Sequence, residues 1–429
     1  YEYMDSSGGT AYVDCGDADR ALVSSQRAPG WYKYNTTLSE EGRREYTFGD
    51  VRMLNGAEVV IEAPGLFGAE LKVEASAFGG DDSGGILHID QPVKLVTGSN
   101  VLIAGMRVSL NHDSAFEGAA EIVIGKVALS VIGSPPTPPL AGYLGLAHSN
   151  ITTIKTVRVV NGAVTVLGVA NIHVDTFELA ADGKIDGTGG SHSAPRMGPG
   201  KPTSASYATS HGGSGQGNTA TYGSVTEPTT TGSGGWSGAS KGGAALHLTA
   251  SSTVILNGVI EMDGWKQGNV GGGSGGSIWI TTNLLQGSGA SISVQGADGY
   301  YYQYAAGGGG RVALTCARSE YAGYTNLAPH IKKVPSISLG GGKSTHSGYE
   351  QMASGSGTAY INCGDADRLL MIGNAAHPWP TDPLTTILVD EKTPGAVSMD
   401  APPNIRAQCT ICQAITMPLT AHGFEAGLS

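Results

Sequence analysis

Short runs of β-branched and alternating apolar residues, separated by Gly, Asn-Gly or Asp-Gly, constrain the fold of this chain most strongly. From Ile151 the sequence reads ITTIKTVRVV-NG-AVTVLG-VANIHVDTFELAADGKIDGTGG. Strand-length pieces occur at Thr156–Val160, Ala163–Leu167, Ile172–Leu179 and Gly183–Asp186. Asn-Gly and Asp-Gly tolerate the positive φ of tight turns. No stretch of about twelve residues or more shows a helical period, so the pattern predicts an all-β protein.

The spacing of these runs favours a parallel β-helix, or β-solenoid, with long Gly-rich loops. The strands are short and follow one another after single turns, unlike the evenly paired hairpins of a sandwich or barrel. Apolar residues recur at intervals that suit successive coils, as in Ile278, Leu285 and Ile292. In a solenoid each coil pairs with the coils before and after it. A propeller is the alternative, but its period of about 40–45 residues is not visible.

Composition agrees with this prediction. The 429 residues include 67 glycines, and 14% are charged, whereas an average soluble chain has roughly 7% Gly and about 25% charged residues. Gly, Ser, Thr and Val are poor helix formers. Between Gly187 and Gly243 the strand-like runs stop. We expect a Gly-rich flap there, laid over one face of the solenoid and ordered by backbone hydrogen bonds, with Tyr207, Tyr222 and Trp236 as its anchors.

Charge argues against a nucleic-acid partner, and the length of the apolar stretches argues against a membrane span. The net charge is −11, and the 25 Lys and Arg residues are spread thinly without a basic stripe, so nucleic-acid binding has no electrostatic basis. The longest apolar stretches, such as Glu121–Gly133, are short and interrupted. We therefore expect no nucleic-acid partner and no membrane span.

One segment of the sequence occurs twice. GGTAYVDCGDADR at Gly8–Arg20 recurs as SGTAYINCGDADR at Ser356–Arg368, and Gly16 and Gly364 are 364 − 16 = 348 positions apart. Nearly identical strands can continue one ladder. We therefore expect the duplicated segment to mark the joint between head-to-tail copies, which makes a second copy of this chain the main partner.

The duplication also predicts the domain organisation. Downstream, Ala57–Pro64 resembles Gly395–Pro402 at an offset of 395 − 57 = 338. Residues 1–348 should form one solenoid repeat, and residues 349–429 should begin the next. The chain starts at Tyr1 without an initiator Met, so we expect a piece of a longer chain or a chain whose leader has been removed.

The Gly-rich half of the chain resembles a known kind of module. The segments that carry the resemblance are Tyr222-Gly223-Ser224, Glu227-Pro228, Gly232–Gly235, Gly271–Ile280 and Gly307–Val312. Over roughly residues 178–316 the sequence is similar to a Gly-rich repeat module of giant secreted and cell-surface glycoproteins of walls or filaments. The resemblance implies a β-helical stalk. The CGDADR segment, with its Cys and paired Asp, departs from that family.

Resemblance and duplication together predict a structural repeat unit of an extracellular fibre or filament, such as a cell-surface glycofibril, a flagellar hair or a wall glycoprotein. The alternative is an adhesin stalk or carbohydrate-binding surface protein. The second alternative is a polysaccharide-active β-helix enzyme. Fragments of pectin-hydrolase motifs occur only at Asp81-Asp82 and His422, far apart and without the Asn-x-Asp and Arg-x-Lys partners. We therefore expect no catalytic residues and no enzyme activity.

The sequence predicts no metal or organic cofactor. Asp17 and Asp19, repeated as Asp365 and Asp367, could hold Ca²⁺ if they alternate on a strand. Asp-rich turns are the commoner reason for such a pattern. The histidines are scattered without ligand spacing, and no Gly-rich stretch continues as a phosphate loop.

Several residues are candidates for glycosylation. Asn35 and Asn150 are sequon positions. The segment SPPTPP resembles the motifs that plants and green algae hydroxylate and arabinosylate in wall glycoproteins; its prolines are Pro135, Pro136, Pro138 and Pro139. We expect covalent glycans and an extracellular location at the cell surface or wall.

All five cysteines are disulfide candidates. Cys15 and Cys363 occupy the same position of the duplicated segment, and each could bridge to a neighbouring coil, for which Cys316 is the nearest candidate before Cys363. Cys409 and Cys412 form a CxxC pair. A zinc site would need a second pair of ligands that the sequence lacks, so a disulfide or buried thiols are expected instead.

Overall fold

We describe the chain from a computed structural model. The structure describes the backbone of residues 8–14, 20–26, 36–39, 45–54, 57–62, 71–80, 85–89, 93–96, 101–104, 106–110, 115–117, 121–125, 142–191, 198–202, 209–215, 220–236, 240–266, 268, 271–299, 306–322, 334–343, 354–364, 369–373 and 404–408. Within these ranges the chain contains strands and no helix, so the all-β prediction is confirmed for them. No helix suited to crossing a membrane occurs in this described part.

The chain divides into two compact units. Unit 1 comprises Tyr1–Thr165, Ala170–Ile185 and Ala250–Gly258, and unit 2 comprises Val166–Val169, Asp186–Thr249 and Val259–Ser429. The strands that lie wholly in unit 1 are β1 (Gly8–Asp14), β2 (Arg20–Gln26), β3 (Thr36–Ser39), β4 (Glu45–Leu54), β5 (Glu58–Glu62), β6 (Leu71–Gly80), β7 (Gly85–Ile89), β8 (Val93–Val96), β9 (Val101–Ala104), β10 (Met106–Leu110), β11 (Ala115–Glu117), β12 (Glu121–Gly125) and β13 (Gly142–Val160).

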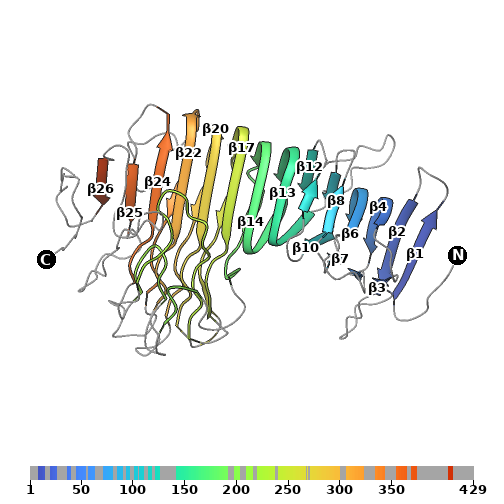
Figure 1. Cartoon of the computed structure of the whole chain (residues 1–429), viewed down its shortest axis with the longest axis horizontal. Helices are drawn as coiled ribbons and strands as arrows, with labels where there is room; N and C mark the ends of the chain where they lie inside the picture. Colours follow the sequence, from blue (N-terminus) through green and yellow to red (C-terminus); the bar gives the residue numbers. More distant parts are fainter. Residues whose placement is uncertain are drawn as a thin grey trace. The chain divides into compact units, whose positions relative to one another are not determined.

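Three strands contribute residues to both units: β14 (Gly162–Leu179), β15 (Lys184–Asp186) and β17 (Ala245–Leu256). The strands of unit 2 are β16 (Ser240–Lys241), β18 (Val259–Glu261), β19 (Trp265–Lys266), β20 (Ser277–Gly287), β21 (Ser291–Ser293), β22 (Arg311–Ser319), β23 (Ser336–Ser338), β24 (Thr358–Cys363), β25 (Leu369–Gly373) and β26 (Asn404–Gln408) (Figure 1).

Besides the antiparallel pair of β1 and β2, unit 1 contains parallel strands that pair with a strand further along the chain. Phe78 pairs with Ile103, Ile103 with Ile124, and Ile124 with Val159. All four side chains are fully buried. Because partners in a parallel ladder face the same way, these residues stack into a continuous apolar column. The successive steps are 103 − 78 = 25, 124 − 103 = 21 and 159 − 124 = 35 residues. The Pro-rich segment falls within the longest step but outside the described residues.

Strands β13 and β14 are longer than the sequence predicted. The predicted pieces Ala163–Leu167 and Ile172–Leu179 belong to a single strand, β14, in which buried and more exposed residues alternate almost throughout. Gly168 has a φ of 70° but does not end the strand. The predicted turn at Asn161 is confirmed: its φ is 49°, and its amide donates to Asp182 Oδ1 at 2.9 Å.

Unit 2 also contains parallel ladders. Leu314 on β22 pairs with Ile280 on β20 and with Ile361 on β24, and these three strands lie side by side in Figure 1. In a second ladder, Ile292 on β21 pairs with Ile260 on β18 and with Ile337 on β23. These aliphatic side chains are buried. Alternating apolar residues at strand positions therefore form the core of this unit, as in unit 1.

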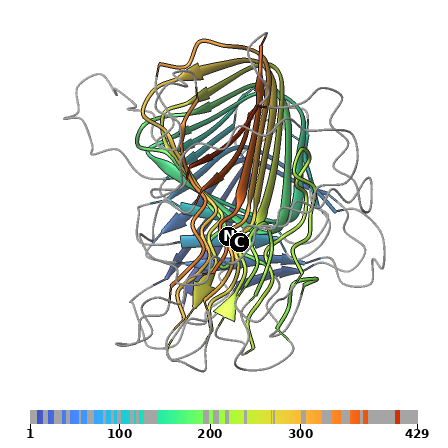
Figure 2. The ribbon, with the colours of Figure 1, turned by 90° about the vertical axis from the view of Figure 1, so that its left-hand side faces the viewer.

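A second part of unit 2 consists of extended Gly-rich segments that are not strands. They include residues 209–215, 231–235, 271–276, 294–299, 306–310 and 339–343, and Figure 2 shows the described tubes of this region bundled together. The amides of Gly307 and Gly310 donate to residues 297 and 294 of one segment, that of Gly308 to Thr209, and that of Gly309 to Gly355. Successive amides of this segment thus point to three different neighbouring segments, and the fourth amide returns to the first neighbour. This pattern is expected of an extended chain with three residues per turn.

The bundle extends beyond the predicted flap. Most of its glycines are buried and hydrogen-bond mainly to other Gly-rich segments. Part of the predicted flap does cover a strand face, because Val225 shares a buried apolar cluster with Ala313 of β22 and Tyr360 of β24. Of the predicted anchors, Tyr222 is buried and Trp236 is half-buried, whereas Tyr207 lies outside the described residues. The sequence correctly indicated ordering by backbone hydrogen bonds.

Candidate functional site

A cluster of buried polar side chains lies in unit 2, where β22 leaves the Gly-rich bundle. Arg311 is the first residue of β22 and has a relative exposure of 0%. Its Nε donates to the Tyr222 carbonyl at 2.7 Å, and its Nη1 donates to Thr358 Oγ1 at 3.0 Å. The guanidinium therefore connects three segments that are far apart in sequence, because its planar fork presents donors in several directions.

His211 packs beside this guanidinium. Its Nδ1 lies 2.7 Å from the Gly275 carbonyl, which can only accept, so Nδ1 carries the proton. Nε2 then accepts from Thr230 Oγ1 at 3.0 Å. Complete burial, and secondarily the charge of Arg311, lower the pKa of His211 to about 3. The imidazole is neutral at physiological pH and acts as a fixed hydrogen-bonding link.

Tyr222 completes the cluster. Its ring centroid lies 4.6 Å from that of His211. Its hydroxyl donates to the Thr231 carbonyl at 2.8 Å and lies 2.7 Å from Ser233 Oγ, which accepts from the Gly200 amide at 3.0 Å. His, Tyr, Ser and Arg are also residues of hydrolytic sites. Here His211, Ser233 and Arg311 all have zero exposure, so the cluster is buried; we call it the buried clasp.

Exchange of His211 for Asn should reduce the acid sensitivity of the fold. The histidine titrates near 6.5 when unfolded and near 3 when folded, so between these values the unfolded state binds more protons and stability falls as pH falls. Over the whole window the effect is on the order of 5 kcal/mol. Urea unfolding at a series of pH values should show the variant losing less stability on acidification than the parent. Parallel profiles would contradict this assignment.

Asp263 affects stability with the opposite dependence on pH, so it serves as a control. Burial raises the pKa of its carboxyl to about 6, although Ser293 Oγ and the Gln295 amide donate to Oδ1 at 2.7 and 2.6 Å. Its contribution is present at low pH and is lost as pH rises from its ordinary value of 3.8 through 6. The parent and the His211→Asn variant both contain Asp263, so its contribution cancels when their unfolding free energies are compared at each pH. The Asp263→Asn variant should lose the Asp263 contribution and keep that of His211.

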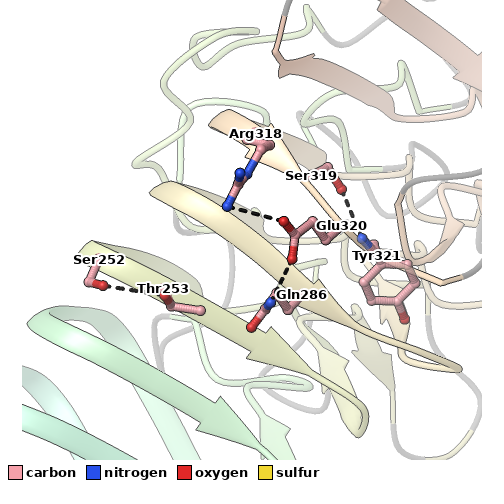
Figure 3. A network of polar contacts seen from close by, with 7 residues as sticks. All are labelled: Ser252, Thr253, Gln286, Arg318, Ser319, Glu320 and Tyr321. Atoms are coloured by element: carbon pink, nitrogen blue, oxygen red, sulfur yellow. Dashed lines mark hydrogen bonds and ion pairs between the residues drawn. The ribbon is translucent and has the colours of Figure 1, made fainter.

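A network of polar side chains lies at the surface, at the C-terminal end of β22. Arg318 Nη2 and Glu320 Oε1 are 3.1 Å apart, and Gln286 Nε2 donates to Glu320 Oε2 at 2.8 Å (Figure 3). The Arg318 side chain is 68% exposed. An exposed ion pair of this kind contributes little stability, about 0–1 kcal/mol. Ser252 and Thr253, also drawn in Figure 3, interact with each other through their hydroxyls at 3.3 Å.

The structure joins two of the candidate cysteines. Cys316 on β22 and Cys363 on β24 face each other in the parallel ladder and form a disulfide with a Cα–Cα distance of 4.3 Å. The other three, Cys15, Cys409 and Cys412, lie outside the described residues.

Only one of the predicted glycosylation positions is described. Asn150 lies within β13, is half-buried, and its Oδ1 accepts from Asn171 Nδ2 at 2.8 Å. A glycan would be attached to the Nδ2 of Asn150, so glycosylation there remains a prediction. The remaining positions lie outside the described residues: Asn35, Pro135, Pro136, Pro138 and Pro139.

The predicted acidic pairs also lie outside the described residues; they are Asp17, Asp19, Asp365, Asp367, Asp81 and Asp82, together with His422. Among the residues that are described, no group of three His, Cys, Asp or Glu side chains could hold a metal ion. Calcium binding by CGDADR thus stays an open prediction.

The two copies of the duplicated segment form the same hairpin. In unit 1, β1 pairs antiparallel with β2, and Tyr12 faces Leu22. In unit 2, β24 pairs antiparallel with β25, and Tyr360 faces Leu370. The two members of the pair have the same sequence offset between the copies: 360 − 12 = 348 for the Tyr and 370 − 22 = 348 for the Leu. The duplication therefore extends from sequence to strand register.

The second strand of each hairpin also pairs in parallel with a later strand of the chain. β2 pairs parallel with β4, with Ala21 opposite Asp50, and β25 pairs parallel with β26, with Leu369 opposite Asn404. Asn404 thus occupies the position of Asp50, an offset of 404 − 50 = 354. The predicted offset of 338 rests on Gly395–Pro402, which lies outside the described residues, so it stays a prediction.

Sequence reasoning missed the buried clasp. His211 was one of several scattered histidines, and Arg311 was noted only as part of a Gly-rich pattern. The one available signal was a lone Arg placed directly after Gly307–Gly310 at the start of an apolar strand. No protein-family model, no curated protein and no solved structure matches this sequence.

Proposed function

We propose that the chain is a structural repeat unit of an extracellular fibre or filament, built as a parallel β-solenoid. The observation that carries the proposal is the recurrence of one hairpin, in the same register, 348 residues later. Parallel ladders with steps of tens of residues in both units support the solenoid. A tandem array of such repeats is a known way to build long, quasi-one-dimensional structures.

The physics of a solenoid end supports head-to-tail assembly. The last strand of a parallel ladder presents N–H and C=O groups without ladder partners, and such an edge promotes association with another strand. Burying such groups without partners costs about 1–3 kcal/mol each. A following copy that begins with an equivalent hairpin would supply the partners.

The chemistry of the described residues supports a load-bearing role in an oxidising environment. The Cys316–Cys363 disulfide links successive strands of one ladder, and disulfides persist mainly outside the cytosol. The cluster of His211, Tyr222 and Arg311 is closed to solvent, so we propose for it a structural role and no catalysis. The proposed partners are further copies of the chain and covalent glycans.

Immunogold labelling of cells that make the protein tests this function. An antibody against the folded chain should place gold along cell-surface filaments at a regular axial spacing. Gold confined to cell contacts would favour an adhesin stalk. A drop in the viscosity of a pectin solution on adding the purified chain would favour a polysaccharide-active enzyme, and either result would overturn the fibre proposal.

Mass spectrometry of the native protein tests the glycan component. We expect sugars on peptides that contain Asn35 and Asn150, and hydroxyproline with attached sugars at residues 135–139. The reason for the second site is the step from Ile124 to Val159 in unit 1, which is 35 − 21 = 14 residues longer than the preceding step from Ile103 to Ile124. It therefore has room for a solvated polyproline II loop. Unmodified peptides at all these positions would contradict the glycoprotein assignment.

A further inference from the structure

We propose that the outer edge of β1 is a docking site for β22 of another copy of this sequence, which pairs with it in parallel. This inference rests on the proposed function and specifies its joint: the strand that covers β1 is Arg311–Cys316. The sequence predicted only that the duplicated segment marks the joint between copies. The pairing in unit 2 shows which strand lies beside the second copy of that segment.

The second copy of the hairpin shows the docked arrangement. On the side away from β25, β24 pairs in parallel with β22, from Arg311 opposite Thr358 to Cys316 opposite Cys363. The ladder continues from the Gly-rich bundle, since the Thr358 amide donates to the Gly310 carbonyl at 3.1 Å. In unit 1, among the strands that the structure describes, the ladder of β1 is the one that it forms with β2. The equivalent edge of β1 is therefore the position that β22 occupies on β24.

Three side-chain contacts accompany this pairing. Arg311 Nη1 donates to Thr358 Oγ1 at 3.0 Å. Ala313, directly opposite Tyr360, shares a buried apolar cluster with it. Cys316 bonds to Cys363. Hydrogen bond, apolar contact and disulfide are thus spaced along one short ladder.

Each β24 residue in these contacts recurs in the first copy. Thr358, Tyr360 and Cys363 correspond to Thr10, Tyr12 and Cys15 at the offset of 348. Thr10 and Tyr12 are on β1, whereas Cys15 lies outside the described residues and enters only as a sequence position. The first copy therefore has the residue types needed to receive an Arg311, an Ala313 and a Cys316.

The other strand of the hairpin has diverged. At the five positions of β25, Leu369–Gly373 reads LLMIG, whereas residues 21–25 of the first copy read ALVSS, and only the Leu at 22 and 370 is shared. By contrast, GTAY is identical in residues 9–12 and 357–360. The strand that contacts β22 in unit 2 is thus nearly the same in both copies, whereas the other strand of the hairpin differs between them. This is expected if β1 also pairs with a β22 strand.

The occupant follows from this equivalence. Strand addition to an open edge gains main-chain hydrogen bonds, and side-chain pockets give it specificity. The strand that the Thr-x-Tyr pattern holds in unit 2 is Arg311–Cys316, so the committed partner is that strand from a second copy. It can arrive from a preceding repeat of the same polypeptide or from a separate chain.

A tandem fusion tests the joint directly. Residues 1–348 are placed before the complete 429-residue sequence, and the protein is refolded in a glutathione buffer whose oxidised form accepts the two electrons and protons of each new disulfide. We expect hydrogen exchange of Gly8–Asp14 in the downstream copy to slow at least tenfold relative to the single chain. We also expect a disulfide between the upstream Cys316 and the downstream Cys15. Unchanged exchange, or a different partner for that Cys15, would overturn the proposal.

A peptide experiment on the unaltered chain covers the case in which the fusion does not fold. A peptide of residues 306–319, AGGGGRVALTCARS, should slow exchange of Gly8–Asp14 at least tenfold, and a scrambled peptide of the same composition should not. Equal effects of the two peptides would contradict specific docking. Both experiments read the joint in solution, so a positive result without filaments on cells would reject the fibre and keep the joint.

Discussion

Replacing Gly275 or Gly310 by Ala should lower the free energy of unfolding by about 3 kcal/mol or more. The Gly275 amide donates to the Gly308 carbonyl at 2.9 Å, and the Gly310 amide donates to the Val294 carbonyl at 2.7 Å. A methyl group at Gly275 would overlap the carbonyl of Val294, and one at Gly310 would overlap the carbonyl of Gly276. These obstacles are backbone atoms that are themselves held in the bundle, so they cannot move aside cheaply.

Urea unfolding followed by far-UV circular dichroism measures this effect, with Gly79→Ala as the matched control. Gly79 lies in β6, where an added methyl group would meet nothing within 4 Å and the backbone is not in the left-handed region. The control should be neutral or stabilising by up to about 1 kcal/mol. Similar losses for all three variants would mean that close packing of the Gly-rich segments is not the cause.

Removing the Cys316–Cys363 disulfide should destabilise the chain by about 4 kcal/mol. The bond joins residues 47 positions apart, and a cross-link over a loop of this length restricts the unfolded chain substantially. The double variant Cys316→Ser with Cys363→Ser preserves side-chain size, so the loss should come mainly from the cross-link.

Reduction of the unaltered protein provides the comparison for this double variant. The reduced protein and the double variant should unfold at nearly the same urea concentration, well below that of the oxidised protein. An unchanged midpoint in both would contradict a structural role for the bond. A loss in the variant but not on reduction would point to packing of the Ser side chains as the cause.

Local pattern predicted the strand content well because strand residues alternate with a period of two wherever one face is buried. The turn at Asn161 was predictable from Asn-Gly alone. The length of β14 was not, because Gly168 has the φ of a turn residue while the alternation of burial continues beyond it. The neighbours of the Gly-rich segments could not be predicted either. The Gly308 amide, for example, bonds to Thr209, which is 308 − 209 = 99 residues away, and nothing in the local sequence encodes that choice.

The candidate site was predictable only in part. Repeat position and proximity made Cys316 a candidate partner of Cys363, because both features are visible in sequence. The contact between His211 and Arg311 depends on how a Gly-rich segment is threaded through the bundle, and the two residues are 311 − 211 = 100 positions apart. The duplicated segment revealed a repeat, but only the pairing register identified β22 as the strand that the hairpin receives.

A helical reconstruction of the native filaments tests the central claim most directly. The account predicts an axial repeat that contains one 348-residue unit, with the β1–β2 hairpin of each repeat beside β22 of the preceding one, and density between Cys15 and Cys316. Filaments that lack this chain, or a reconstruction in which the outer edge of β1 faces solvent or an unrelated strand at every repeat, would contradict it.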